Sequence, residues 1–123
     1  MEAIERKISE GIAVETINLL RATMHEAHEI KSNLMEDSMD YKKIIVDVST
    51  CEYIDSTFFG ALVHSYRKIK EKEGSMILVM NDTFLRRTFL FREIEKIFKV
   101  RSTCRKAINE FNKCSEEVDY NKN

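Results

Sequence analysis

Asp55, Ser56 and Thr57 place a carboxylate directly before two hydroxyl groups, at the point where an apolar run has ended and a helical pattern begins. A serine at the start of a helix lies near unpaired backbone N–H groups and the positive end of the helix dipole. A phosphate added to that hydroxyl would meet favourable local electrostatics. Capping of the helix by Asp55 or Ser56 is also a sufficient reason for these residue types. The spacing alone leaves a phosphorylation site and a simple cap both open, and the two roles can coexist.

Two phenylalanines, Phe58 and Phe59, follow the hydroxyl pair. Their helical spacing to Leu62 and Val63 favours core packing for at least one ring. The two rings cannot easily both be buried. A ring left at the surface beside Ser56 would be an apolar anchor for a partner protein, since aromatic residues are favoured at binding hot spots.

The residues that most often carry catalysis or bind metals are poorly placed for either role. His25 and His28 lie three positions apart, whereas the zinc-protease pattern needs the second histidine four residues after the first. His64 has no acidic or hydroxyl neighbour in sequence that would suggest a catalytic triad. A chain with only three glycines offers no Gly-rich phosphate loop. We therefore predict a protein that is not an enzyme and that holds no cofactor and no metal.

The composition is that of one soluble domain. The chain has 123 residues, of which 43% are hydrophobic and 33% charged, and its formal net charge of −1 provides no field that would attract nucleic acid or an anionic membrane. The N-terminal MEAIERK lacks the apolar stretch of a signal peptide, and the run MILVM is far too short to span a bilayer. Cys51, Cys104 and Cys114 are an odd number without CxxC spacing, which favours buried or incidental thiols over disulfides or a zinc knuckle. We expect a cytoplasmic protein.

One basic stretch in the second half could be mistaken for a nucleic-acid surface. Its members are Arg86, Arg87, Lys96, Lys99, Arg101, Arg105 and Lys106. Glu93, Glu95 and Glu110 interleave with them, and no aromatic stacking pattern accompanies them. We predict a solvated face and no nucleic-acid partner.

Two strands and a helix are predicted before residue 43. The segments IERKI and IAVETINLL flank the turn sequence SEG, as expected of a hairpin. Thr23 followed by Glu26 is a capping box, and apolar residues then recur at helical spacing to about Glu36. The polar stretch DSMDYKK predicts a connection after this first helix.

Strands and helices alternate in the remainder. The run IIVDV is short and almost wholly apolar, as in a strand buried on both faces. After the loop STCEYID, an apolar stripe from Ser56 to Lys72 predicts a helix that stops at Gly74. SMILVM predicts another buried strand, NDTFLRRTFLF runs into a third helix, and IFKV is a short strand. A last helix from about Thr103 to Asn112 precedes the polar tail KCSEEVDYNKN, which we expect to fray. This order predicts an α/β fold.

The stretch KKIIVDVSTCEYIDSTFFGALVHSYRKIKEKEGSMILV, residues 42–79, resembles the central segment of the STAS domain, the family of the bacterial anti-sigma factor antagonists. RRTFLFREIEKIFKV resembles the family's third helix and following strand, and STCRKAINEF its final helix. The resemblance implies a single STAS-like domain over residues 1–113 with a polar tail over 114–123. It implies a mixed sheet of four or five strands, with residues 44–48 and 76–80 central, and about four helices packed mainly on one face.

The family signature Asp-Ser-(Ser/Thr)-Gly-(Leu/Phe)-Gly maps onto residues 55–60. Asp55 matches its aspartate, Ser56 the serine that a cognate kinase phosphorylates, Thr57 the adjacent hydroxyl and fallback acceptor, and Gly60 the second glycine. Two departures indicate a divergent member. Phe58 stands where the family usually has its first glycine, and Leu20 and Thr23 replace the glycine and aspartate that commonly follow the second strand.

The resemblance implies an anti-sigma factor antagonist that acts by partner switching. Such a protein binds a GHKL-type serine kinase when Ser56 is unmodified and releases it when Ser56 is phosphorylated, and a PP2C-type phosphatase resets the cycle. Asp55, Ser56, Thr57, Phe58 and Phe59 are then the predicted partner-binding residues, and the free protein is expected to be a monomer. The alternative is a constitutive STAS-like subunit of a stressosome or lipid-transport complex, with no phosphate cycle.

Overall fold

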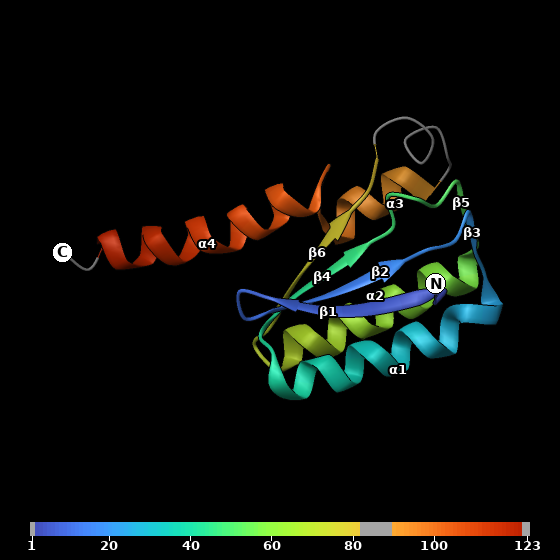
Figure 1. The fold of residues 1–123 in the computed structure, drawn as a ribbon, viewed down its shortest axis with the longest axis horizontal. Coiled ribbons are helices and arrows are strands. Elements are labelled where there is room, and N and C mark those ends of the chain that lie inside the picture. The colour runs from blue at the N-terminus through green and yellow to red at the C-terminus, as the bar shows by residue number, and fades with distance from the viewer. Residues whose placement is uncertain (1, 82–89, 122–123) are drawn as a thin grey trace.

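The computed structural model describes residues 2–81 and 90–121. Helices cover both faces of a mixed sheet (Figure 1). The sheet has the spatial order β1 (Ile4–Ser9), β2 (Ile12–Ile17), β4 (Lys43–Asp47), β6 (Ser75–Val79) and β7 (Lys99–Arg101), and a separate pair joins β3 (Arg21–Ala22) to β5 (Tyr53–Ile54). The helices are α1 (Met24–Asp40), α2 (Ser56–Glu71), α3 (Leu90–Ile97) and α4 (Cys104–Asn121). The predicted α/β fold, with a mixed sheet of four or five strands and about four helices, is confirmed: the described residues form five sheet strands and four helices.

The first two strands form the predicted hairpin. They pair antiparallel, from Ile4 opposite Ile17 to Ser9 opposite Ile12. The turn residues Glu10 and Gly11 both have positive φ, 55° and 76°. Two successive positive φ values match the twist of the flanking strands, which is why such turns favour glycine.

The two apolar strands β4 and β6 occupy the middle of the sheet, as predicted. β4 pairs parallel with β2 and with β6, and β6 pairs parallel with β7. Because side chains alternate along a strand, Ile44 and Val46 join the core on one face and Ile45 joins the core on the other. Both faces of these strands are therefore buried, which explains their nearly continuous apolar sequence.

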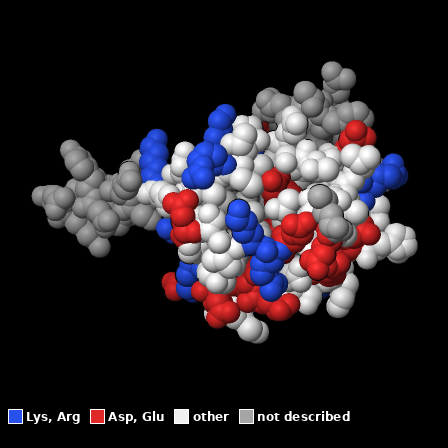
Figure 2. Space-filling view, in the orientation of Figure 1, with Lys and Arg blue, Asp and Glu red and all other residues white. Residues whose placement is uncertain are grey.

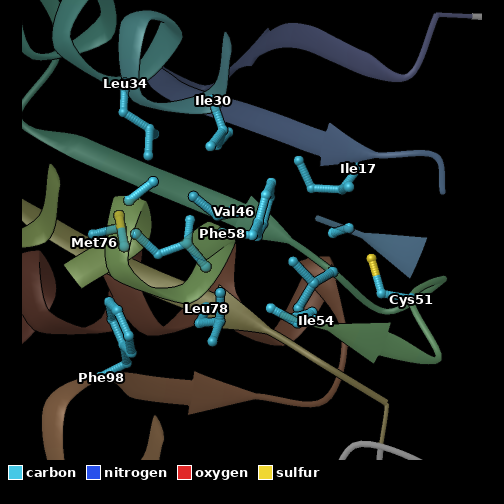
Figure 3. Packing of buried hydrophobic residues seen from close by; sticks show 14 of the residues in the cluster. Ile17, Ile30, Leu34, Val46, Cys51, Ile54, Phe58, Met76, Leu78 and Phe98 are labelled. Carbon is cyan, nitrogen blue, oxygen red and sulfur yellow. The ribbon is translucent and has the colours of Figure 1, made fainter. Parts of the chain in front are cut away.

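Three helices pack on one face of the sheet and one on the other. Figure 3 shows part of the larger core, in which Ile30 and Leu34 of α1 and Phe58 of α2 lie over the sheet with Phe98, the residue after α3. On the opposite face, α4 covers a second core with Ala107, Ile108 and Phe111. The predicted arrangement, with helices mainly on one face, is confirmed.

The end of α1 differs from the prediction. The helix continues to Asp40 instead of ending near Glu36. Asp37 belongs to the polar stretch that was predicted to be a connection, yet it is buried. Nε of Arg6 on β1 lies 2.9 Å from Oδ1 of Asp37 and 2.9 Å from Oε2 of the buried Glu15. A tertiary network of polar contacts around Arg6 therefore extends the helix where local polarity suggested a loop.

The second half shows further differences in boundaries. α4 runs to Asn121 instead of ending near Asn112, so residues 114–121 are helical where a frayed tail was expected. In Figure 1 this part of α4 extends beyond the sheet. The short strand begins at Lys99 instead of Ile97, because the N–H of Phe98 still donates to the carbonyl of Ile94 at 2.8 Å, a helical bond. The start predicted for the third helix, within NDTFLRRTFLF, lies largely outside the described residues.

Candidate functional site

The segment before Ser56 is fixed by a short strand pair that the sequence analysis read as a plain loop. β3 and β5 run parallel, with Arg21 opposite Tyr53 and Ala22 opposite Ile54. The carbonyl of Leu20 accepts the N–H of Tyr53 at 3.1 Å, and that of Ala22 accepts the N–H of Asp55 at 3.0 Å. These bonds place the beginning of α2 beside the beginning of α1.

Asp55 caps both helices. Its Oδ1 accepts the backbone N–H of Phe58 at 2.8 Å, the bond of an N-cap residue to the first turn of α2. Its Oδ2 accepts the N–H of Met24, the first residue of α1, at 2.9 Å. The capping box predicted at Thr23 and Glu26 completes the start of α1. The cap that could have been Asp55 or Ser56 is therefore Asp55.

Ser56 is the first residue of α2 and is exposed, as is Thr57. Because Asp55 supplies the cap, the hydroxyl of Ser56 is not needed for capping. It has no hydrogen-bond partner within residues 2–81 and 90–121. The predicted exposed helix start is confirmed, and the site combines a free hydroxyl, the positive end of a helix dipole and an adjacent carboxylate.

The two phenylalanines take different positions. Phe58 is fully buried, with Val46 among its neighbours in the core cluster (Figure 3). Phe59 is half-buried and packs edge to face against Phe98, with 6.2 Å between ring centroids. The prediction that Phe58 binds a partner is wrong for its side chain, because a buried ring offers no surface. The large residue in place of the family's first glycine fills the core instead.

Three exposed apolar side chains border the site, and the sequence analysis did not identify them as a group. They are Leu20, Met24 and Tyr53. The guanidinium of Arg21 lies over the Tyr53 ring, 4.4 Å from its centroid. The sequence shows that Leu20 replaces a glycine common in the family, which could have indicated an unusual exposed residue. Its position next to Tyr53, however, follows only from the pairing of β3 with β5.

The remaining candidates from the sequence are the histidines and cysteines. His25 and His28 are exposed on α1 and His64 on α2. Within the described part of the chain, no group of three or more His, Cys, Asp or Glu residues could hold a metal ion. Burial, and then the carboxylate of Asp47, raises the pKa of Cys51 to about 12. Burial and a hydrogen bond from Sγ to the carboxylate of Asp47, at 3.1 Å, also raise the pKa of Cys104 to about 12.

Most described members of the basic stretch are paired with acids, whereas Lys106 donates to the hydroxyl of Ser102. Arg86 and Arg87 lie outside the described residues. Arg101 contacts Glu110 at 2.8 Å, Lys99 contacts the same carboxylate at 3.5 Å, and Lys96 lies 3.8 Å from Glu93. The hydrogen bond from Arg101 lowers the pKa of Glu110. Figure 2 shows basic and acidic side chains interleaved on the face in view. None of the helices over residues 2–81 and 90–121 is long and apolar enough to cross a membrane.

The comparisons with solved structures give the fold. A candidate anti-sigma factor antagonist from Thermotoga maritima is 24% identical, with a TM-score of 0.74 over 87% of this chain and 92% of that one. A STAS domain protein from Planctomyces limnophilus is 20% identical, with a TM-score of 0.75 over 89% and 98%. SpoIIAA, a Bacillus cell fate determinant, is 17% identical; its unphosphorylated form matches with a TM-score of 0.69 and its phosphorylated form with 0.67, over 89% of this chain and 98% and 99% of those.

The sequence comparisons give the family. No curated protein matches the chain. The family model of the STAS domain matches residues 1–107, which include the sheet, the paired helix starts and the Asp55–Ser56–Thr57 segment. The chain belongs to the STAS domain family.

Proposed function

We propose that this protein is a phospho-regulated anti-sigma factor antagonist that acts by partner switching. Unmodified, it binds a GHKL-type serine kinase that serves as the anti-sigma factor, and it releases that kinase once Ser56 is phosphorylated. A PP2C-type phosphatase removes the phosphate. The protein performs no chemistry itself, acts in the cytoplasm, is a monomer when free, and needs neither nucleic acid nor membrane.

The observation that carries this proposal is the exposed hydroxyl of Ser56, which has no partner among the described residues, beside a cap that belongs to Asp55. Phosphorylation adds up to about two negative charges at the positive end of α2, so the fold tolerates it. The same charges arrive next to the carboxylate of Asp55, on the surface that faces a partner. A partner shaped for a neutral hydroxyl would be repelled electrostatically, so binding changes while structure does not.

The comparisons support the proposal at the level of the family. SpoIIAA is named as an anti-sigma factor antagonist and has been solved in an unphosphorylated and a phosphorylated form with closely similar TM-scores to this chain. That protein therefore keeps its fold when it carries a phosphate.

Phosphate mapping tests the site. The purified cognate GHKL-type kinase, with ATP, should add one phosphate to the wild-type chain, and peptide mass spectrometry should locate it on Ser56. Ser56→Ala should remain unmodified, and Thr57→Val should be modified like the wild type. A phosphate on Thr57 would move the switch to the fallback acceptor. No phosphate from a kinase that binds the chain would favour the constitutive STAS-like subunit of a stressosome or lipid-transport complex.

Charge variants separate binding from folding. Ser56→Asp should bind the kinase at least about tenfold more weakly than wild type, a loss of about 1.4 kcal/mol, because it puts a second carboxylate beside Asp55. Ser56→Ala should still bind, since alanine is as neutral as the unmodified serine. Neither substitution removes the cap, so both variants should unfold at the wild-type temperature. Equal kinase affinity for Ser56→Asp and wild type would refute the switch.

A further inference from the structure

We propose that Leu20, Met24 and Tyr53 form the docking surface by which the kinase that modifies Ser56 selects this chain. We call these three side chains the apolar rim. The proposal rests on the proposed function and adds to it a recognition element outside the signature Asp55–Gly60. Its occupant is a protein with an apolar pocket next to its own active site.

The exposure of these side chains is unusual within the described part of the chain. Leu20 is 58% exposed, Met24 64% and Tyr53 41%. Only two other large apolar side chains there are exposed to this degree, Ile8 on the edge strand β1 and Met39 near the end of α1. Single exposed apolar residues are common on proteins, whereas a group around a modifiable hydroxyl indicates an interaction site.

Hydrogen bonds tie the backbone of the apolar rim to the segment directly before Ser56. The carbonyl of Leu20 accepts the N–H of Tyr53, and the N–H of Met24 donates to Asp55, the neighbour of Ser56. Three peptide units separate Tyr53 from Ser56, so their Cα atoms lie at most about 11 Å apart. The three residues come from two segments, residues 20–24 and Tyr53, and these backbone contacts bring the two segments together before α2.

A kinase that reaches the Ser56 hydroxyl must cover its surroundings. A stable protein interface buries about 800 Å² on each partner, which corresponds to a disc of roughly 16 Å radius. Tyr53, by its chain spacing, and Met24, through its bond to Asp55, lie within such a radius of Ser56, and the carbonyl of Leu20 is bonded to Tyr53. Burial of an exposed leucine, methionine and tyrosine together removes apolar area from water and so favours binding, and it does so without contact to the hydroxyl itself.

The charges around the apolar rim favour a protein over an apolar lipid phase. Arg21 lies over one face of the Tyr53 ring and is exposed, as is Glu52, the residue before Tyr53. An apolar centre with charged residues of both signs at its edge is the usual composition of a protein interface. A partner pocket lined by apolar side chains, with an acidic group opposite Arg21, would be complementary to it.

Steady-state phosphorylation kinetics test the proposal. The probe is the purified GHKL-type kinase shown by peptide mapping to modify Ser56, with ATP saturating and the chain varied. Leu20→Asn, Met24→Gln and Tyr53→Ser should each raise KM about tenfold or more and leave kcat within about twofold, because they remove docking contacts and not the acceptor. The matched controls, Ile8→Asn for Leu20 and Met39→Gln for Met24, should leave both constants unchanged. Met24 and Met39 lie at opposite ends of α1, roughly 20 Å apart.

The outcomes separate the two proposals. If the kinase modifies Ser56 in wild type and in all variants with equal KM, the apolar rim is not the docking surface, and the proposed function stands. If peptide mapping finds no phosphate on Ser56 or Thr57 from a kinase that binds the chain, the proposed function fails and the docking surface with it. A concentration-dependent dimer in sedimentation that Leu20→Asn abolishes would assign the surface to a second copy of the chain. Binding to phosphatidylcholine vesicles that Leu20→Asn abolishes would assign it to a membrane. Either result would overturn the kinase assignment.

Discussion

Asp55 and Met24 are joined by a hydrogen bond of 2.9 Å between a carboxylate oxygen and the first backbone N–H of α1, while the other oxygen of Asp55 caps α2. One side chain thus satisfies unpaired N–H groups on two helices that are distant in sequence. The arrangement fixes α1 and α2 relative to each other at the end where Ser56 lies. Because Asp55 is the cap, the hydroxyl of Ser56 is not needed to cap α2 and is available for modification.

Because Asp55 caps two helices, its substitution should destabilise the protein more than the loss of an ordinary cap does. Asp55→Ala should lower the free energy of unfolding by about 2–3 kcal/mol, more than the roughly 1 kcal/mol typical of one lost cap, because two backbone donors lose their acceptor. Asp55→Asn, which keeps one acceptor oxygen, should lose less than Asp55→Ala. Urea denaturation of both variants checks this, with Glu52→Ala as an exposed control. A loss for Asp55→Ala no larger than that of a single cap would mean that the bond to Met24 contributes little.

Phe58 should be essential to stability although the related signature has a glycine at this position. Its ring is fully buried, so Phe58→Ala should cost about 3–5 kcal/mol in unfolding free energy. Phe58→Gly should cost up to about 1 kcal/mol more, since glycine is a weaker helix former. Phe59→Ala is the matched control and should cost clearly less, because that ring is only half-buried. Equal losses at the two positions, measured by chemical denaturation, would contradict the different burial of the rings.

Local patterns predicted most of the fold because the relevant interactions are local. The SEG turn and the capping box at Thr23 involve residues a few positions apart, and the apolar strands β4 and β6 are identified by their own composition. The end of α1 was not predictable in this way. Asp37 and Ser38 look like loop residues, and they are buried because Arg6 and Lys72, distant in sequence, bond to them.

The candidate site was predicted in part. Asp55, Ser56 and Thr57 were identified from three consecutive residues, and their exposure follows from the start of a helix. The sequence could not decide whether Asp55 or Ser56 is the cap, because both side chains suit the role. Nor could it reveal the apolar rim, since β3 and β5 have two residues each and are too short to leave a periodic pattern.

Cys51, which is buried, and Cys104, which is half-buried, should react slowly with thiol reagents. Burial raises the pKa of Cys51 and of Cys104 to about 12, so at pH 8 roughly one molecule in ten thousand carries either thiolate. In a Cys114→Ser background, Cys51 of the native protein should react with a disulfide reagent only as fast as the protein unfolds, and Cys104 should react slowly because little of its thiol is ionised. Both thiols should react at once in urea. Fast reaction of Cys51 in the native protein would show that its surroundings open far more readily than its burial indicates.

Asp37 should make the protein less stable as the solution becomes more alkaline. Burial, and then the neighbouring carboxyl of Glu15, raises the pKa of Asp37 to about 8, and Arg6 opposes this only in part. Because the folded-state pKa lies above the ordinary value of about 4, the stabilising protonated form is fully present below pH 4 and is lost as pH rises through 8.

The variant Asp37→Asn isolates this effect, since asparagine stays neutral at every pH. The charged groups facing position 37 are Arg6 on β1, Glu15 on β2 and Glu36 on α1, and all remain in the variant. Between about pH 5 and pH 8 the wild type should lose up to about 1.4 kcal/mol of unfolding free energy per pH unit relative to Asp37→Asn, the limit for one proton. Urea denaturation of both proteins at each pH gives the difference. A constant difference across that range would mean that Asp37 is already ionised at pH 5, stabilised by Arg6 in spite of its burial.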